Sequence, residues 1–333
     1  MTLGAAQFRR DSLAAIAFAW TTTGVKRSLI IDCDPGVDDG VALLLAFGSP
    51  KLDLLAITTV AGNVDAALTA RNARIIRQIA GREDVPVHAG ATAPLVRPPI
   101  AAAHFHGVSG LGDLAVFEPA APLAEGHAVQ AIIAAVMTRP SGSVDIAVTG
   151  PMTNLALAMR LEPALIGRLG TVAVMGGARS EGGNITASAE YNIYADPHAA
   201  QVVFGSGAKV VAFGLDATHQ VRTNPARMAA IASVGTARST AAVELLTFSQ
   251  TVELDLAKRV GAPMHDSSPV AWLIDPGLFT VVPARIEVET QSDLTLGHTA
   301  VEFRLQDPDA CCTFWAIQAD ADGLFDLLIG ALA

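Results

Sequence analysis

Residues 30–39 read Ile-Ile-Asp-Cys-Asp-Pro-Gly-Val-Asp-Asp and lie between an apolar run and an Ala/Leu-rich segment. The apolar run 28–32 predicts a strand, and residues 39–47 predict a helix. Pro35-Gly36 is a turn dipeptide, and the acids that follow it fall at the helix N-terminus, where the macrodipole favours negative charge. Ligands of open α/β sheets bind beyond the carboxyl ends of the strands. We therefore expect this stretch at a ligand-binding edge.

The same alternation of strand and helix patterns continues along the chain. Further strands are predicted at 52–60, 85–88, 144–148, 171–175, 210–214, 286–289, 300–304 and 312–316. Further helices are predicted at 64–80, 128–138, 154–160, 197–205, 236–258, 265–274 and 323–329. Repeated strand–helix units predict an α/β fold with a mainly parallel, Rossmann-like open sheet and helices on both faces.

Domain organisation follows from the same pattern. Residues 28–333 are predicted to form a single domain, and residues 1–27 an N-terminal extension that is disordered or weakly structured. Residues 90–125 are rich in Pro, Gly and Ala and are too long for an ordinary connection, so they predict a functional loop or lid.

Composition restricts the partners and the compartment. Of 333 residues, 51% are hydrophobic, and 22 basic against 32 acidic residues give a net charge of −10, which disfavours nucleic acid as a partner. Three cysteines fit a reducing compartment, and no apolar run is long enough to cross a membrane. We expect a cytoplasmic protein; the alternative is export, because Arg9-Arg10 before an apolar run resembles a twin-arginine signal.

Four carboxylates, Asp32, Asp34, Asp38 and Asp39, are concentrated around the first turn, and no Lys or Arg occurs between residues 28 and 50. Two like charges about 4 Å apart repel by about 4 kcal/mol at an effective dielectric near 20. Converging carboxylates therefore need a cation, raised pKa values or outward-pointing side chains. Oxygen ligands favour a hard ion such as Ca²⁺ or Mg²⁺.

Other readings of the cluster stay open at this point. Asp38 and Asp39 could only cap a helix while Asp32 supports the turn. An EF-hand does not fit, because the glycine comes too early and the twelfth position is Leu43. A Mg²⁺-dependent phosphatase with Asp32 as nucleophile and Asp34 as acid/base is a competitor, although Gly36 replaces its usual Thr or Val.

Further motifs follow residues 32–39 in order along the chain: VAGN at 60–63, HGVSGLG at 106–112, VTGPMTN at 148–154, VMGG at 174–177, GN at 183–184, AEYNI at 189–193, DP at 196–197, GLDATH at 214–219 and HD at 265–266. This ordered set, between about residues 28 and 276, resembles the nucleoside hydrolase family, of the inosine/uridine-preferring type.

The resemblance implies hydrolysis of the N-glycosidic bond of ribonucleosides at a Ca²⁺ site. Its metal ligands would be Asp34, Asp39, the main-chain carbonyl of Thr149 and Asp266, with one water whose proton Asp34 accepts. Asp32 would support the loop. The ribose would be held by Asp38, Asn63, Met175, Asn184, Glu190, Asn192 and Asp266. The sugar would develop oxocarbenium character, stabilised by the surrounding carboxylates.

The base-binding part of the resemblance is thinner. Family members usually place tyrosines in the long helix before the His-Asp motif, and this chain has Ser249 and Glu253 there. His106 and His265 are the remaining candidates to protonate or stack on the base. Taken singly, Asn63 could cap the helix from residue 64, and Met175 could be a core residue.

Other functions compatible with the motifs are hydrolysis of another N-riboside and non-catalytic nucleoside binding. The resemblance also suggests a homodimer or homotetramer.

Overall fold

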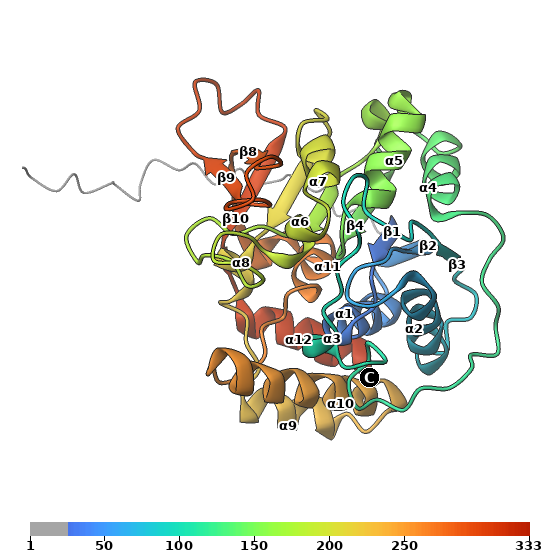
Figure 1. Cartoon of the computed structure of the whole chain (residues 1–333). Helices are drawn as coiled ribbons and strands as arrows, with labels where there is room; N and C mark the ends of the chain where they lie inside the picture. Colours follow the sequence, from blue (N-terminus) through green and yellow to red (C-terminus); the bar gives the residue numbers. More distant parts are fainter. Residues whose placement is uncertain (1–25) are drawn as a thin grey trace, which may run out of the picture.

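The computed structural model describes residues 26–333, in which an eight-stranded sheet is flanked by helices (Figure 1). The Arg9-Arg10 pair and most of the expected N-terminal extension lie outside these residues, and Arg27 begins the first strand. The strands are β1 (Arg27–Cys33), β2 (Leu52–Thr59), β3 (Val87–Ala89), β4 (Val144–Val148), β5 (Val172–Met175), β6 (Val210–Phe213), β7 (Phe279–Pro283), β8 (Arg285–Val288), β9 (Thr299–Glu302) and β10 (Thr313–Ala319).

The helices connect these strands and cover the sheet. They are α1 (Val37–Gly48), α2 (Ala66–Ile79), α3 (Ala103–His106), α4 (Ala128–Met137), α5 (Thr153–Leu161), α6 (Tyr191–Ala195), α7 (Pro197–Phe204), α8 (Leu215–Thr218), α9 (Pro225–Ser233), α10 (Ala237–Val252), α11 (Ser267–Ile274) and α12 (Ala321–Leu332). Short 3₁₀ helices are η2 (Pro163–Arg168) and η4 (Pro276–Leu278), and a π-helical turn, η3 (Glu253–Ala257), extends α10.

The strand order is β3-β2-β1-β4-β5-β6-β10-β7, and only the β10–β7 pair is antiparallel. The chain runs outward from β1 to β3 and then returns to β4 on the other side of β1. This reversal makes β1/β4 a topological switch point, where open α/β sheets form their binding crevice. The predicted fold class, a mainly parallel sheet with helices on both faces, is confirmed.

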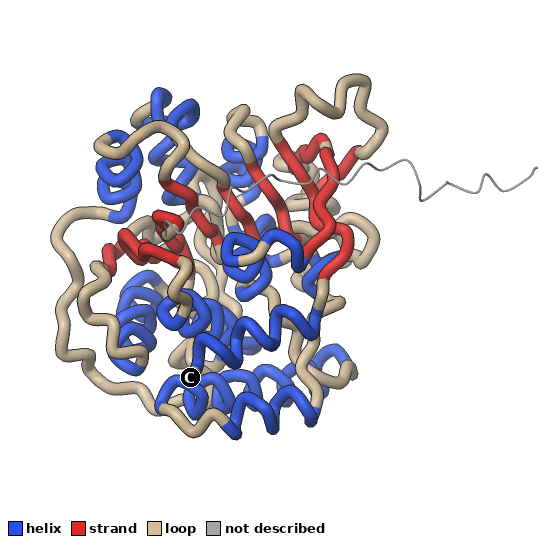
Figure 2. The backbone as a smooth tube through the Cα atoms, turned by 180° about the vertical axis from the view of Figure 1, so that it is seen from behind, coloured by secondary structure: helices blue, strands red, loops and turns tan. Residues whose placement is uncertain are grey.

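Both faces of the sheet are buried, which explains the near-continuous apolar runs of the strands. In β1, Leu29, Ile31 and Cys33 belong to one core cluster and Ile30 to the other, because successive side chains point to opposite faces. Residues of α1, α2, α10, α11 and α12 pack on the first face, and residues of α4, α5 and α7 on the second. Figure 2 shows helices on both sides of the sheet.

The structure differs from the local predictions at several points. Helix α2 begins at Ala66 rather than at residue 64 and is capped by Asp65, whose carboxylate accepts the Leu68 N–H, so the alternative role of Asn63 as its helix cap is excluded. Strand β7 and helix α9 were not predicted, although Asn224-Pro225 is an N-cap signal at the start of α9. Strands β8 and β9 pair with each other outside the main sheet.

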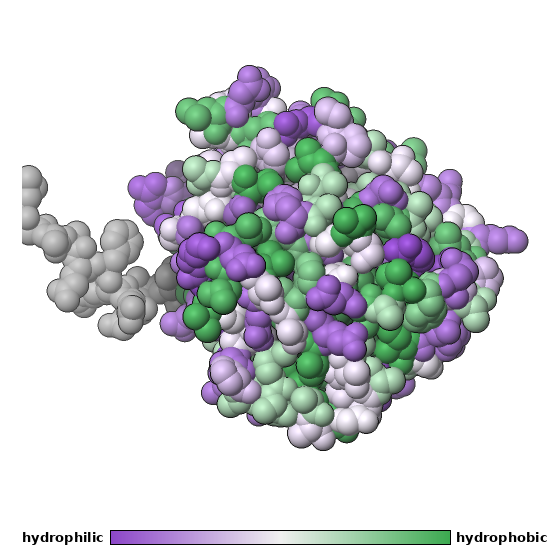
Figure 3. Space-filling model, turned by 60° about the horizontal axis from the view of Figure 1, so that its bottom comes forward, coloured by the Kyte–Doolittle hydropathy of each residue, from purple (hydrophilic) through white to green (hydrophobic). Residues whose placement is uncertain are grey.

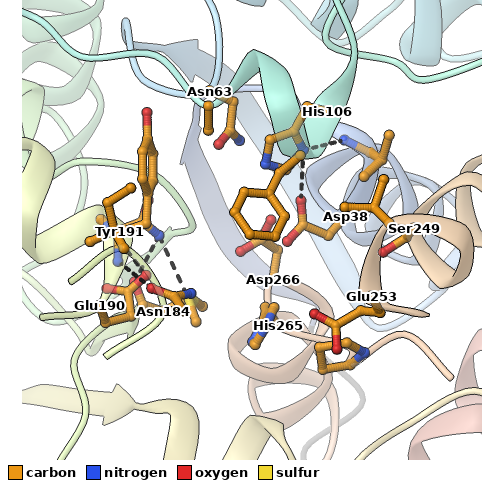
Figure 4. A pocket seen from close by; sticks show the side chains of 18 of the residues that line it. Asp38, Asn63, His106, Asn184, Glu190, Tyr191, Ser249, Glu253, His265 and Asp266 are labelled. Atoms are coloured by element: carbon orange, nitrogen blue, oxygen red, sulfur yellow. Dashed lines mark hydrogen bonds and ion pairs between the residues drawn. The ribbon is translucent and has the colours of Figure 1, made fainter. Parts of the chain in front are cut away.

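The long segment 90–125 runs over the surface and contains only the short helix α3. Arg74 and Arg77 of α2 hold it by donating to the carbonyl of Ala121, each at 2.9 Å. Helix α3, near the middle of the segment, brings His106 against the backbone N–H of Val37 and beside Asp38 (Figure 4). Hydrophobic and hydrophilic residues are interspersed over the face shown in Figure 3. Within residues 26–333, no helix is long and apolar enough to cross a membrane.

Candidate active site

Asp34 lies at the switch point, directly after β1, and is fully buried. Glycines enclose its carboxylate: a Cβ added at Gly62 would lie 2.0 Å from Oδ2, and one at Gly150 would lie 2.4 Å from Oδ1. The backbone N–H of Asn63 donates to Oδ2 at 2.7 Å, whereas Oδ1 has no hydrogen-bond partner among the described residues. A buried carboxylate oxygen in this state is suited to a cation or to an O–H donor.

Asp39 ties three loops together. Its Oδ2 accepts from the Gly36 N–H at 3.0 Å and the Asn63 side-chain amide at 3.1 Å, and its Oδ1 accepts from the Thr149 hydroxyl at 2.7 Å. Burial and the neighbouring Asp38 raise the pKa of Asp39 to about 6 despite these bonds. The loops after β1, β2 and β4 therefore meet on one carboxylate.

Asp266, at the start of α11, completes an acidic group with Asp38 and Asp39. One carboxylate oxygen from each of the three lies within 4.8 Å of the others. Burial, and then the charges of Asp38, Asp39 and Asp34, raises the pKa of Asp266 well above its usual range. Burial, then Asp39, likewise raises the pKa of Asp34.

These residues fit a hard divalent cation. The donors are carboxylate oxygens with a main-chain carbonyl nearby, which suits Ca²⁺ or Mg²⁺ better than a softer metal. Burial, and then repulsion between the neighbouring carboxylates, raises the pKa values of Asp34 and Asp39, and a cation between them would offset both effects. The three carboxylates whose oxygens converge are those of Asp38, Asp39 and Asp266. The predicted metal ligands differ in one carboxylate, because they include Asp34 in place of Asp38.

The wall opposite the aspartates carries amide and carboxylate groups (Figure 4). Asn192 donates to the carbonyls of Thr149 at 2.8 Å and Met175 at 3.2 Å. Glu190 caps α6: Oε1 accepts the N–H of Asn192, and Oε2 accepts those of Gly177 and Ile193. The Asn184 side-chain oxygen accepts the N–H of Tyr191 at 2.9 Å.

Asp32 is buried behind the site and takes no place in its lining. It accepts from the Asn154 side-chain amide at 2.8 Å and the Thr58 hydroxyl at 2.7 Å, and Asn154 also binds the Thr59 carbonyl at 3.0 Å. These bonds join the ends of β1 and β2 to α5. Sequence reasoning gave Asp32 a supporting role but did not identify Asn154 as its partner.

The two predicted histidines both line the pocket. His106 Nδ1 accepts the Val37 N–H at 3.2 Å, and burial lowers the pKa of His106 to about 4. Its 3.7 Å approach to Asp38 is therefore not an ion pair. His265 Nδ1 lies 2.8 Å from the Thr218 hydroxyl, and burial, with His219 nearby, lowers the pKa of His265 well below its usual value.

All the predicted ribose-binding residues meet in a single pocket of about 430 Å³. Its lining is Val37, Asp38, Asn63, Ala102, Phe105, His106, Thr149, Met175, Glu181, Gly183, Asn184, Ile185, Glu190, Tyr191, Asn192, His219, Ser249, Val252, Glu253, Leu256, Arg259, Pro263, His265 and Asp266. The volume suits a small molecule of nucleoside size. Asp34 and Asp39 lie behind this lining.

A family model described as inosine-uridine preferring nucleoside hydrolase matches residues 29–326. The chain belongs to this family. Nucleoside hydrolases cleave N-glycosidic bonds, so the protein is an N-glycosyl hydrolase, and the family sets it apart from the phosphatases that the Asp-x-Asp spacing also allowed.

Individual nucleoside hydrolases resemble it over nearly their full length. An inosine-uridine preferring nucleoside hydrolase of Crithidia fasciculata is 39% identical, over 92% of this chain and 97% of that protein. A pyrimidine-specific ribonucleoside hydrolase of Salmonella agona is 40% identical, over 90% and 96%. The structure of a purine-preferring ribonucleoside hydrolase from Gardnerella vaginalis superposes with a TM-score of 0.86 at 29% identity, over 92% and 98%.

The end of the nucleoside hydrolase pocket formed by α10 and η3 is charged. Ser249 and Glu253 are one helical turn apart and both line it. Glu253 forms a 2.6 Å ion pair with Arg222, in which both side chains are mostly buried. Sequence reasoning placed Glu253 there but missed Arg222, because the pair joins segments 31 residues apart.

Three further residues of this end were also missed: Glu181, His219 and Arg259. His219 closes a motif shared with the family, GLDATH at 214–219, and that position was its one available signal. Glu181 and Arg259 stand in loops without a distinctive pattern.

Proposed function

We propose that this nucleoside hydrolase cleaves ribonucleosides to free base and ribose with a Ca²⁺ ion held by Asp34, Asp39, Asp266 and the main-chain carbonyl of Thr149. The observation that carries the proposal is Oδ1 of Asp34, a buried carboxylate oxygen without a partner among the described residues, next to a converging acidic group. A bound Ca²⁺ would offset the repulsion among these carboxylates, lower the pKa of the attacking water and help to hold the ribose hydroxyls.

Asp34 is the proposed general base. Its Oδ2 is engaged by the Asn63 N–H, so the carboxylate is held in one orientation and Oδ1 is left to accept a proton from the attacking water. Gly62 and Gly150 make the space that this carboxylate occupies, because a Cβ at either position would clash with it.

The ribose is proposed to lie between Asp38 and Asn63 on one side and Asn184, Glu190 and Asn192 on the other. Amide and carboxylate groups can bind vicinal hydroxyls, and Met175 supplies an apolar contact and a carbonyl beside them. As the C1′–N bond breaks, the sugar gains positive charge, which the surrounding carboxylates stabilise.

We propose that the base preference is set outside the ribose-binding part of the pocket. The relatives share the fold, yet their names specify inosine and uridine, pyrimidine nucleosides, or purine nucleosides. We propose that His106, His265 and the charged end around Glu253 contact the base. Hydrolysis of another N-riboside is the second candidate, favoured by Ser249 and Glu253 in place of tyrosines.

A panel of purine and pyrimidine ribonucleosides, assayed for released reducing sugar, tests the proposal. We expect turnover that is lost on metal stripping and restored by Ca²⁺. Binding of nucleosides without release of ribose would instead favour a non-catalytic protein. Release of ribose from an N-riboside outside the panel, but from none within it, would favour the second candidate.

The oligomeric state and the cellular location of the protein are also predictions. A homodimer or homotetramer is expected, and light scattering on the purified protein tests it. A cytoplasmic location is expected, with twin-arginine export as the alternative, and fractionation of cells expressing the full chain distinguishes the two.

A further inference from the structure

Asn72, a fully buried residue of α2, links two segments of the pocket that are far apart in the sequence. Its side-chain amide nitrogen donates to the main-chain carbonyl of Pro35 at 3.0 Å and to that of Ser109 at 2.9 Å. Pro35 belongs to the aspartate turn, residues 34–39, and Ser109 belongs to the His106 loop, residues 106–112. One amide nitrogen therefore holds the turn and the loop together.

The turn and the loop fit closely around this amide. Gly110 has a φ of 87°, and a Cβ added there would lie 2.7 Å from Nδ2 of Asn72 and 3.3 Å from the Pro35 carbonyl oxygen. Glycine is needed at this position, because other residues rarely adopt such a φ and their Cβ would crowd the hydrogen bond. Arg71 donates to Oδ1 of Asn72 at 3.2 Å, so the amide is held with its nitrogen toward both carbonyls.

His106 forms a second contact between the loop and the turn. Its Nδ1 accepts the Val37 N–H at 3.2 Å, at the start of α1. His106 lines the pocket beside Asp38 (Figure 4), whereas Asn72 is not among the lining residues. Of the two contacts, the one made by His106 therefore faces a ligand, and the one made by Asn72 supports it from behind.

We propose that Asn72 is a positioning residue that holds the His106 loop on the aspartate turn. This inference rests on the proposed function, in which His106 contacts the base and Asp34 is the general base. Without the amide, the carbonyls of Pro35 and Ser109 lose a donor, and a buried acceptor without a partner is costly. Ser109 is only half-buried whereas Pro35 is buried, so the loop is the side that moves toward water and carries His106 with it.

A double-mutant cycle on the Ca²⁺-loaded full chain tests the link. In Asn72→Ala, kcat/KM for a ribonucleoside is expected to fall about ten-fold, the effect of one lost buried hydrogen bond on the barrier. In the His106→Ala background the same substitution is expected to change kcat/KM by less than about two-fold, because the loop then has no side chain to position. Losses that a merely structural role causes would instead add.

Gln78→Ala is the matched control. Gln78 lies on the same helix, and its Oε1 accepts the Ala120 N–H at 2.8 Å, so it holds the same long segment at a point away from His106. This variant should keep full activity. Circular dichroism checks that each variant is folded, and if Asn72→Ala is not, Gly110→Ala takes its place because its methyl group would crowd the same amide.

Hydrogen exchange measures the His106 loop directly and does not require turnover. In Asn72→Ala, exchange of residues 106–112 is expected to be at least about ten-fold faster than in the wild type, while residues 144–148 of β4 stay protected. Unchanged exchange in the loop would overturn the inference. So would full activity of Asn72→Ala, additive losses in the double variant, or a loss in Asn72→Ala without one in His106→Ala. If the wild type cleaves no ribonucleoside, the proposed function fails, and hydrogen exchange alone decides whether Asn72 holds the loop.

Discussion

The backbone N–H of Asn63 donates a 2.7 Å hydrogen bond to Oδ2 of Asp34 and leaves the other oxygen of this buried carboxylate without a partner among the described residues. The Asn63 side chain then donates to Oδ2 of Asp39 at 3.1 Å. One residue from the loop after β2 thus orients two carboxylates from the loop after β1. The carboxylate proposed as the general base is therefore positioned before any ligand binds.

Asp34→Ala tests this role. We expect kcat to fall by at least about 100-fold, because a positioned general base contributes that much or more. The fold should persist, so circular dichroism and thermal unfolding accompany the ribose-release assay. Asp53→Ala, on an exposed strand position, is the control and should retain activity. Full activity in a folded Asp34→Ala protein would refute the assignment.

Gly150→Ala tests the enclosure of Asp34 without changing any functional group. The added Cβ would lie 2.4 Å from Oδ1, so the carboxylate must shift and kcat is expected to fall at least ten-fold, roughly the effect of about 1.4 kcal/mol on the barrier. Gly167→Ala is the matched control, since nothing lies within 4 Å of its Cβ. Equal activity of the two variants would show that this packing is unimportant.

Stability without metal should rise as the pH falls. Burial raises the folded-state pKa of Asp39 to about 6, against 3.8 for an ordinary Asp, and raises that of Asp266 as well. Well above pH 6 the folded protein carries the full negative charge of Asp39 in its buried position. As the pH falls through the folded-state pKa, it binds protons before the unfolded chain does, and the free energy of unfolding increases.

Calcium should remove this dependence. At 100 times its Kd, Ca²⁺ adds about 2.7 kcal/mol to the free energy of unfolding. Scanning calorimetry of chelator-treated and Ca²⁺-loaded protein between pH 5 and pH 8, a range set by the value of about 6 for Asp39, measures both effects. A Tm at pH 8 that does not respond to Ca²⁺ would contradict the metal site.

Glu253→Tyr tests the base end of the pocket. An aromatic ring on this wall can stack on a purine, so kcat/KM for purine nucleosides is expected to rise relative to pyrimidine nucleosides. The change also removes the carboxylate partner of Arg222, so a lower Tm is expected. Glu253→Gln, which loses the charge without gaining a ring, separates the two effects. An unchanged substrate ratio in Glu253→Tyr would disprove this reading of α10.

Most strands and helices could be predicted because their signals are local. Apolar runs such as residues 144–148 and helical patterns such as 128–138 coincide with β4 and α4 within one residue. The predictions failed where an element forms only by packing or pairing with a distant part of the chain. Strand β7, which was not predicted, forms against β10, about 35 residues further along the chain.

The sequence alone determined the strand–helix alternation, the family and the residues that could form a metal and ribose site, since these depend on residue type and order. Tertiary structure decided the charged end of the pocket. Arg222 reaches Glu253, and Glu181 reaches His219, only because loops after different elements meet at one edge of the sheet. Pairings between segments 31 and 38 residues apart depend on three-dimensional packing, which no local pattern encodes.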